Sequence, residues 1–276
     1  MNPIKNVILR NGVQIPYIGL GTYKASFSEN MQVVVNNALE AGYRSIDAAE
    51  HYGNEDQVGA AIRNSGYPRE KLFLTTKIWN TDHGYDQTML AFEKSVRKLG
   101  TYVDMLLIHW PCPMLGLYQD TWRALQDLYA AGKVKAIGVS NFKIHHLEEI
   151  RRLGGEQPMV NQIEMHPYFI QDELLEYCRE NKIQVEAWSP LLRGAGAAGD
   201  PTVTELAGKY NRSPVQIILR YLVQLGVRVL VKSSSKEHTI QNIRIFDFTL
   251  SDDDIDLMHT LNTGKRFFQD PDEYYL

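Results

Sequence analysis

The amino-acid sequence predicts an α/β fold in which eight parallel strands and their helices close into a (β/α)8 TIM barrel, preceded by an N-terminal β-hairpin. Eight apolar, strand-like runs alternate with helical windows at a spacing of roughly 30 residues. The run MLLI at residues 105–108 is apolar throughout, which is typical of strands covered on both faces. A doubly wound sheet could hold similar strands, but the count of eight favours the closed barrel.

The strands are expected in the following order. Two short strand-like runs flank Asn11 and Gly12, a pair typical of tight turns, so we expect a small hairpin that covers the bottom of the barrel. The barrel strands are then predicted at residues 17–22, 43–47, 72–77, 103–109, 134–140, 159–164, 184–189 and 227–231.

Helices between these strands are indicated by apolar residues at helical spacing and by their end signals. Ser213 is expected to cap one helix, with Pro214 at its first position. Three apolar stripes each end at a glycine, which commonly stops a helix: Met89, Phe92, Val96 and Leu99 before Gly100; Trp122, Leu125, Leu128 and Tyr129 before Gly132; and Ile144, Leu147 and Ile150 before Gly154.

Length and composition limit the class of protein. The chain has 276 residues, 44% of them hydrophobic, and we expect a single barrel domain over residues 1–276. A net charge of −4 and a pI near 6.1 argue against nucleic acid or an anionic membrane as the main partner. Cys112 and Cys178 offer no disulfide framework and no metal-ligand spacing. The start lacks a signal-like apolar run, which predicts a cytoplasmic protein.

Polar and aromatic residues stand at the ends of the predicted strands, where such barrels carry their chemistry. Lys77 lies inside the apolar run LFLTTKIW, and a buried lysine needs a partner, for which Asp47 on the neighbouring strand is the obvious candidate. Seven consecutive strands carry such residues at or near their ends: Asp47, Lys77, His109, Ser140 with Asn141, Gln162, Trp188 and Lys232.

Tyr52 lies five residues past the end of the second barrel strand, in the stretch IDAAEHYGNE. A free tyrosine has a pKa of about 10, and a nearby ammonium such as Lys77 would lower it. With His109 beside it, the phenol could donate a proton to a carbonyl oxygen while another group delivers hydride. The same residues could instead form a structural polar cluster, and spacing alone does not decide. Glu50 and His51 are expected to be solvated.

The segment VKSSSKEHTIQN at residues 231–242 is a better candidate for a phosphate site than the glycine-rich stretch GAGAAG. Lys232 and Ser233 follow the last strand, and Ser235 is expected to cap the next helix, so an anion would meet an ammonium, hydroxyls and free N–H groups there. The GAGAAG stretch at residues 194–199 is a weak dinucleotide fingerprint, because the five residues 189–193 stand between Trp188 at the strand end and the first glycine. We interpret it as a loop that either closes over a ligand or is plain surface.

Trp188 lies near this phosphate segment, at the end of the seventh strand. Its ring could stack on a flat ligand ring, or it could simply pack in the core. Ser140, Asn141 and Gln162 on neighbouring strands could hydrogen-bond an amide on that ligand ring. Together these residues describe a nicotinamide pocket.

With these residues in view, the chain resembles the aldo-keto reductase superfamily over nearly its whole length. GYRSIDAAEHYGNE is similar to the first signature of that family, and LLIHWP and GVSNF are similar to its central ones. NQIEMHP, AWSPL and KSSSKEHTIQN match later stretches in the same order. The resemblance implies a (β/α)8 barrel with an N-terminal hairpin, a monomer, and NADPH or sometimes NADH as cofactor.

The resemblance also implies residue roles. Tyr52 would be the general acid, with Lys77, Asp47 and His109 completing the tetrad. The implied cofactor contacts are Trp188 on the nicotinamide; Ser140, Asn141 and Gln162 at its carboxamide; Ser189 and Leu191 along the pyrophosphate; Lys232 and Ser233 at the 2′-phosphate; and Gln241 and Asn242 near the adenine.

Two residues depart from the family pattern. His238 stands where many members place an arginine for the 2′-phosphate, and Gln241 stands where a glutamate is common. A neutral histidine lacks the fixed charge and the bidentate geometry of arginine, so the NADPH preference would be weaker or dependent on pH. Because Lys232 and the serines remain, we expect NADPH as cofactor with NADH tolerated.

The substrate pocket is expected to be walled by Tyr23, Trp79 and Trp110. The loop after the fourth strand and the C-terminal tail are short, which resembles the bacterial diketogluconate and glyoxal reductases more than the steroid-converting members. Aldehydes, 2-oxoaldehydes and keto sugars are therefore the expected class of substrate.

Two other functions are open at this point. A metal-dependent barrel hydrolase could use Glu164, His166, His109 and Asp47 as ligands, although no dense ligand cluster is evident in the sequence. A non-catalytic barrel could bind a nucleotide as a sensor or subunit, although the presence of all four tetrad residues favours an enzyme.

Overall fold

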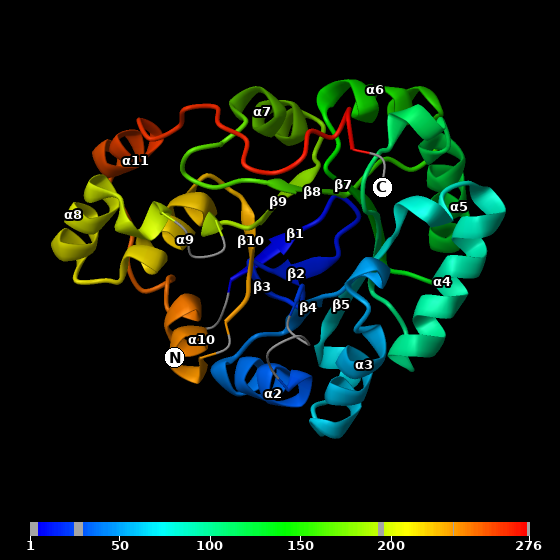
Figure 1. The fold of residues 1–276 in the computed structure, drawn as a ribbon, viewed down its shortest axis with the longest axis horizontal. Coiled ribbons are helices and arrows are strands. Elements are labelled where there is room, and N and C mark those ends of the chain that lie inside the picture. Colours follow the sequence, from blue (N-terminus) through cyan, green and yellow to red (C-terminus); the bar gives the residue numbers. More distant parts are fainter. Residues whose placement is uncertain (1–4, 25–29, 193–195, 234, 275–276) are drawn as a thin grey trace.

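The computed structural model describes residues 5–24, 30–192, 196–233 and 235–274. Within these residues, parallel strands close into a barrel in the order β10-β3-β4-β5-β6-β7-β8-β9, which confirms the predicted fold class (Figure 1). The barrel strands are β3 (Ile18–Gly21), β4 (Ser45–Asp47), β5 (Phe73–Ile78), β6 (Met105–Ile108), β7 (Ala136–Ser140), β8 (Val160–Glu164), β9 (Gln184–Trp188) and β10 (Arg228–Val231).

Helices surround this barrel (Figure 1). The predicted end signals are confirmed: Gly100 has a φ of 62° and ends α4, and the Ser213 hydroxyl accepts from the N–H of Gln216 at the start of α9. The helices are α2 (Met31–Ala41), α3 (Glu55–Asn64), α4 (Tyr85–Leu99), α5 (Tyr118–Ala130), α6 (Ile144–Arg152), α7 (Asp172–Glu180), α8 (Pro201–Tyr210), α9 (Pro214–Gln224), α10 (Lys236–Ile243) and α11 (Asp252–His259).

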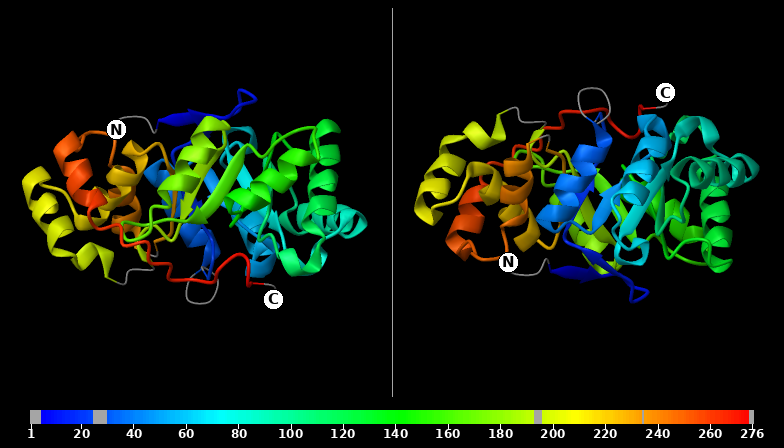
Figure 2. Two further views of the ribbon diagram at one scale, coloured as in Figure 1. Left: turned by 90° about the horizontal axis from the view of Figure 1, so that it is seen from above. Right: turned by 90° about the horizontal axis from the view of Figure 1, so that it is seen from below.

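The predicted hairpin is formed by β1 (Asn6–Ile8) and β2 (Gln14–Pro16), which pair antiparallel. Gly12 turns the chain with a φ of 85°, a conformation that glycine adopts without strain. Ile15 is fully buried, so the hairpin packs its apolar side against the barrel. Figure 2 shows the hairpin at one end of the barrel and the C-terminal segment after α11 at the other.

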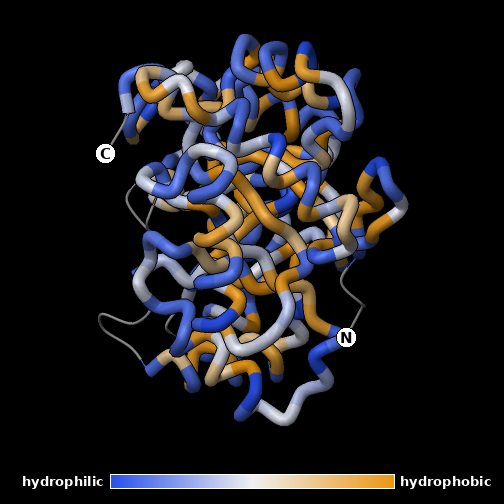
Figure 3. Tube along the Cα trace, turned by 90° about the vertical axis from the view of Figure 1, so that its right-hand side faces the viewer, coloured by the Kyte–Doolittle hydropathy of each residue, from blue (hydrophilic) through white to orange (hydrophobic). Residues whose placement is uncertain are grey.

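The core lies in and around the barrel strands. Every residue of β5 and β6 is buried, and Figure 3 shows long hydrophobic stretches running through the middle of the molecule. Gly138 on β7 allows the neighbouring strand to come close, because a Cβ at this position would lie 2.6 Å from the carbonyl oxygen of Val160. This tight packing fixes the strand ends on which the polar residues stand.

Candidate active site

A cavity of about 780 Å³ opens at the carboxyl ends of the barrel strands. A larger hollow of about 1000 Å³ lies at the hairpin end, and no candidate catalytic residue is among the described residues that line it. The predicted residues that line the 780 Å³ cavity are Tyr23, Asp47, Tyr52, Trp79, His109, Trp110, Ser140, Asn141, Gln162, Trp188, Ser189, Leu191, Lys232, Ser233 and His238.

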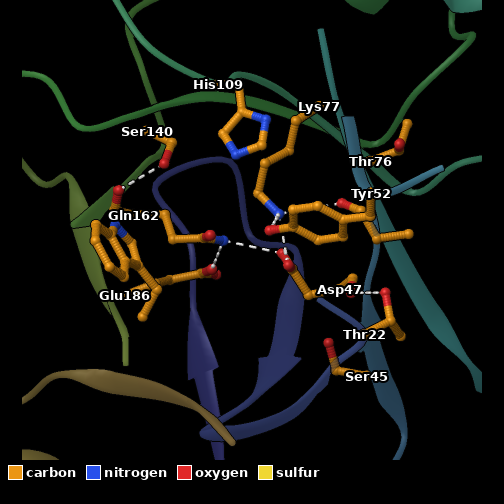
Figure 4. A network of polar contacts seen from close by, with 12 residues as sticks. Thr22, Ser45, Asp47, Tyr52, Thr76, Lys77, His109, Ser140, Gln162 and Glu186 are labelled. Carbon is orange, nitrogen blue, oxygen red and sulfur yellow. Dashed lines mark hydrogen bonds and ion pairs between the residues drawn. The ribbon is translucent and has the colours of Figure 1, made fainter. Parts of the chain in front are cut away.

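The Lys77 ammonium contacts two residues that line this cavity, Asp47 and Tyr52 (Figure 4). Lys77 Nζ is 2.5 Å from Asp47 Oδ1 and donates to the Tyr52 hydroxyl at 3.2 Å and to the Ala48 carbonyl at 3.1 Å. The Lys77 side chain is fully buried, as predicted from its apolar run. The structure thus brings together the lysine, the carboxylate and the phenol that the sequence places on separate segments.

Tyr52 is held in position by a short helical turn, η1 (Glu50–Tyr52), that begins three residues after the end of β4. Gly53 ends this turn with a φ of 65°. Asn54 is buried and donates from Nδ2 to the Thr22 carbonyl at 2.9 Å, which ties the turn to the end of β3. Helix α3 begins directly after Asn54, so the phenol is fixed between two regular elements.

Burial dominates the protonation of Tyr52. Burial raises the pKa of the phenol, and the Lys77 ammonium opposes that rise without reversing it. The expectation of a net lowered pKa is therefore wrong, although the lysine acts in the predicted direction. A raised pKa keeps the phenol protonated at neutral pH, which a proton donor requires. For Lys77 itself, burial lowers the pKa, but the Asp47 carboxylate and Tyr52 raise it more.

His109 follows β6 and lies beside the phenol. The ring centroids of His109 and Tyr52 are 5.7 Å apart, with the rings nearly perpendicular. Burial and the nearby Lys77 ammonium hold the pKa of His109 well below its usual value. At neutral pH the imidazole is therefore uncharged and can donate one N–H to an oxygen in the cavity.

The aromatic walls of the cavity include one residue without a predicted role. The ring centroids of Tyr23 and Tyr52 are 5.1 Å apart, and those of Trp79 and His109 are 5.0 Å apart. His51 is exposed, yet it stacks on Trp79 at a centroid distance of 3.6 Å and lines the cavity. The expectation that His51 is simply solvated is therefore incomplete, and no pattern in the sequence indicates this stacking.

A second buried histidine, His83, is expected to make the unfolding free energy depend on pH. Its side chain is 4% exposed, and burial lowers its pKa to about 4. Between pH 6.5 and pH 4 the unfolded chain would bind a proton that the folded protein does not, so stability falls as the pH falls through this window. We expect His83 to account for a loss of about 3 kcal/mol in unfolding free energy between pH 7 and pH 4. Urea unfolding at both pH values measures this loss, and a His83→Leu variant that loses as much as wild type would contradict it.

The residues predicted to hold a carboxamide converge at one side of the cavity. Asn141 Nδ2 donates to the His109 carbonyl at 2.9 Å and to the Ser140 hydroxyl at 3.1 Å. The indole N–H of Trp188 donates to Asn141 Oδ1 at 2.8 Å. Gln162 lies next to this group and is 2% exposed. These contacts fix the rotamers of the wall and orient the Trp188 ring.

Ser189 and Leu191 line the cavity next to Trp188, where the sequence places a pyrophosphate. The Ser189 hydroxyl is buried, and no described residue hydrogen-bonds it. Buried hydroxyls normally have a partner, so an orphan hydroxyl at the cavity wall fits a bound polar ligand. Residues 194 and 195 of the GAGAAG stretch lie outside the described residues, so whether this loop closes over a ligand stays a prediction.

The predicted anion end of the cavity is formed by Lys232, Ser233 and the start of α10. Ser235 caps α10 as predicted and accepts from the N–H of His238. His238 is exposed and lines the cavity. Ser234 lies outside the described residues. This end of the cavity thus combines a lysine, hydroxyl groups and a helix N-terminus, all of which bind anions. The unpartnered Ser189 hydroxyl lies further along the same cavity. Together these groups fit a phosphorylated dinucleotide.

Two residues predicted to be near the adenine are not among the described residues that line the cavity. Gln241 Nε2 donates to Glu237 at 3.2 Å on the surface of α10. Asn242 is 5% exposed and lies on the buried side of the same helix. The structure therefore places both on the helix that borders the cavity, one turn beyond its lining.

The C-terminal segment supplies cavity residues that the sequence did not assign. Phe268, Gln269 and Tyr274 line the cavity. The Tyr274 ring lies 4.5 Å from that of Trp110, and the Phe268 ring lies 4.9 Å from that of Trp188. The tail is rich in aromatic residues, but sequence alone gives no signal for the direction in which an irregular segment crosses a barrel.

Two further residues that the sequence did not assign lie inside the barrel. Glu186 on β9 and Arg228 on β10 are fully buried and form an ion pair at 2.5 Å. Each is a charged residue within an apolar strand, QVEAW and RVLV, which is the same signal that singled out Lys77. A charged residue within an apolar strand is therefore the sequence signal that indicates Glu186 and Arg228.

The residues weighed as metal ligands are held by other contacts. The Glu164 carboxylate accepts from the backbone N–H of Phe267 at 2.7 Å and lies 3.1 Å from His166 Nε2, while Asp47 is paired with Lys77. These residues do not converge on one point. In the described part of the chain, the ligand atoms that do converge belong to His145, His146 and Asp272.

No helix in the described ranges is sufficiently long and apolar to span a bilayer.

Comparisons with known proteins show which family this chain belongs to. The model of the Aldo/keto reductase family matches residues 17–263. Glyoxal reductase of Bacillus subtilis (strain 168) is 47% identical over 268 residues, covering 97% of this chain and 96% of the relative. Methylglyoxal reductase DkgA of Escherichia coli (strain K12) is 40% identical over 268 residues, covering 96% of each. The crystal structure of a Bombyx mori aldo-keto reductase in complex with NADP has a TM-score of 0.89 at 35% identity, covering 98% of this chain and 96% of that chain. The protein belongs to the aldo/keto reductase family.

Proposed function

We propose that this protein reduces small aldehydes and ketones to alcohols with NADPH, and that Tyr52 donates the proton. The observation that carries the proposal is the phenol of Tyr52, held 3.2 Å from the buried Lys77 ammonium at the floor of the cavity. The names of the relatives from B. subtilis and E. coli support 2-oxoaldehydes as substrates, and the NADP complex of the B. mori protein supports the cofactor.

The protein groups act on the substrate oxygen. A carbonyl oxygen placed between Tyr52 and His109 accepts hydrogen bonds from both, which polarises the carbonyl bond. A nicotinamide cofactor held in the cavity would supply the hydride for the carbonyl carbon. The Tyr52 O–H gives its proton to the oxygen as negative charge develops there, and Lys77 stabilises the phenolate that is left. Asp47 holds the ammonium in position.

Binding of the cofactor is assigned to the residues along the cavity. Ser140, Asn141 and Gln162 would hold the carboxamide, and the Trp188 ring would cover the nicotinamide. The remaining assignments run toward α10: Ser189 and Leu191 at the pyrophosphate, Lys232, Ser233 and His238 at the 2′-phosphate, and Gln241 and Asn242, by resemblance alone, near the adenine.

Turnover of a panel of small carbonyls, followed as NADPH oxidation at 340 nm, tests the proposal. The panel contains glyoxal, methylglyoxal, simple aldehydes and keto sugars, and kcat/KM is measured with NADPH and with NADH. We expect turnover of the 2-oxoaldehydes and a higher kcat/KM with NADPH. A clear preference for NADH would overturn the assigned cofactor. Binding of NADPH without turnover of any carbonyl would favour the non-catalytic nucleotide-binding barrel. The monomeric state and the cytoplasmic location stay predictions.

Replacing His238 with arginine is expected to sharpen the cofactor preference. Arginine adds a fixed charge that can form charge-assisted hydrogen bonds to a 2′-phosphate, which NADH lacks. We expect the ratio of kcat/KM for NADPH over NADH to rise about tenfold. The matched control is His259→Arg on α11, outside the described residues that line the cavity, and it should leave the ratio unchanged. An unchanged ratio in His238→Arg would show that His238 does not face the phosphate.

A further inference from the structure

Glu186 occupies a central place in the barrel interior. It lies on β9 and is the register partner of both Gln162 on β8 and Arg228 on β10. Register partners in parallel strands point to the same side of the sheet, so the three side chains meet inside the barrel. Glu186 and Arg228 are fully buried and Gln162 is 2% exposed. Glu186 is not among the described residues that line the cavity, whereas Gln162 is.

The amide nitrogen of Gln162 is shared by two carboxylates (Figure 4). Gln162 Nε2 donates to Asp47 Oδ2 at 2.9 Å and to Glu186 Oε2 at 3.1 Å. A carboxylate can only accept, and an amide nitrogen has two hydrogens, so both are used. The flipped amide would lose both bonds and set its oxygen against two negative groups. The two acids therefore force the amide oxygen of Gln162 away from them.

Arg228 balances the charge of Glu186 at the hairpin end of the barrel. Its guanidinium contacts Glu186 Oε1 at 2.5 Å and donates to the Pro16 carbonyl at 2.6 Å and to the Ser45 hydroxyl at 2.5 Å. A Cβ on Gly19 would lie 2.7 Å from Arg228 Nη2, so a glycine at this position leaves room for the guanidinium. The pair Glu186–Arg228 is thus anchored independently of the cavity, and Glu186 is a fixed acceptor.

We propose that Glu186 is a positioning residue that fixes the orientation of the Gln162 amide, so that the amide oxygen and not the N–H faces the nicotinamide pocket. This rests on the proposed function. With its nitrogen bound to Asp47 and Glu186, Gln162 offers only its oxygen to a ligand. That oxygen selects the NH2 group of a carboxamide. Asp47 alone would secure one N–H of Gln162, and Glu186 supplies the second restraint.

Ligand binding to Glu186→Gln tests this role without any turnover. The new amide can present either an oxygen or an N–H to Gln162, so Asp47 alone still favours one orientation of the Gln162 amide, and the restraint on that orientation is weaker. We expect the Kd of NADPH, from quenching of protein fluorescence, to rise about five- to tenfold, as expected for one weakened hydrogen bond. The Kd of adenosine 2′,5′-bisphosphate, which lacks the nicotinamide, should change less than about twofold.

A cofactor analogue and a matched variant separate positioning from general destabilisation. The 3-acetylpyridine analogue of NADP has a methyl group in place of the carboxamide NH2, so its Kd should hardly respond to Glu186→Gln. The control Glu55→Gln makes the same change at another buried glutamate. Glu55 accepts a hydrogen bond from the Thr76 hydroxyl and is not among the described residues that line the cavity. It should leave all three Kd values unchanged.

Each outcome has a defined meaning. Equal weakening of all three ligands by Glu186→Gln, or no weakening of NADPH, overturns the positioning role while the proposed function stands. A wild-type protein that does not bind NADPH overturns the proposed function and the role of Glu186 with it. If Glu186→Gln does not fold, the double variant Glu186→Gln/Arg228→Gln removes both buried charges and is expected to show the same ligand pattern.

Discussion

Tyr52→Phe is expected to lower kcat for carbonyl reduction by about 10²- to 10⁴-fold, the usual contribution of a positioned general acid. The substitution removes only the hydroxyl that Lys77 contacts at 3.2 Å, and it keeps the ring that packs against Tyr23. Because that hydroxyl is not assigned to the cofactor, the Kd of NADPH should stay within about threefold of wild type. Steady-state kinetics with methylglyoxal and fluorescence titration with NADPH measure the two quantities.

His51→Ala is the matched control for this prediction. His51 neighbours Tyr52 in sequence and lines the same cavity, but it contacts Trp79 and not Lys77. Burial lowers the pKa of His51, so it is an uncharged wall residue near neutral pH. We expect its removal to change KM more than kcat. Loss of all activity in His51→Ala, with Tyr52→Phe still active, would transfer the acid role to the histidine.

Lys77→Met is expected to cost both stability and activity. The variant leaves the Asp47 carboxylate buried without its ammonium, and breaking a buried pair in this way costs about 3–5 kcal/mol of unfolding free energy. The phenolate that forms at Tyr52 would also lose its nearest positive charge, so kcat should fall on the order of 10²-fold or more. Urea unfolding and turnover of methylglyoxal measure the two effects.

Lys94→Met provides the comparison on the surface. Lys94 pairs with Glu50 at 3.2 Å, but its side chain is 53% exposed, and such pairs contribute about 0–1 kcal/mol. We expect this variant to be nearly as stable and as active as wild type. A Lys77→Met protein that is no less stable than Lys94→Met would show that the buried pair is not needed to hold Asp47.

Local patterns were sufficient to predict the fold. The apolar runs predicted β5 and β6 because strands buried on both faces need no polar alternation, and both are buried at every residue. Gly100 and Ser213 predicted helix ends because left-handed and capping conformations favour those residue types. The same kind of argument predicted the contact between Lys77 and Asp47, because a charge in an apolar strand must find a partner.

Other features depend on three-dimensional detail that no local pattern carries. The net shift of the Tyr52 pKa is a balance between burial and the Lys77 charge, and spacing gives the sign of each contribution but not which is larger. The placement of Tyr274 against Trp110 depends on the path of an irregular segment. The orientation of the Gln162 amide depends on Glu186, whose register with it is set by barrel closure.

A single-turnover experiment examines the proton-donating role of Tyr52 most directly. Protein with NADPH already bound is mixed with excess methylglyoxal, and the loss of absorbance at 340 nm is followed by stopped flow, so that cofactor binding and product release do not contribute. We predict that wild type oxidises its bound NADPH rapidly and that Tyr52→Phe, with NADPH equally bound, does so at least about 100-fold more slowly. Equal rates in the two proteins would contradict the assignment of Tyr52 as the proton donor.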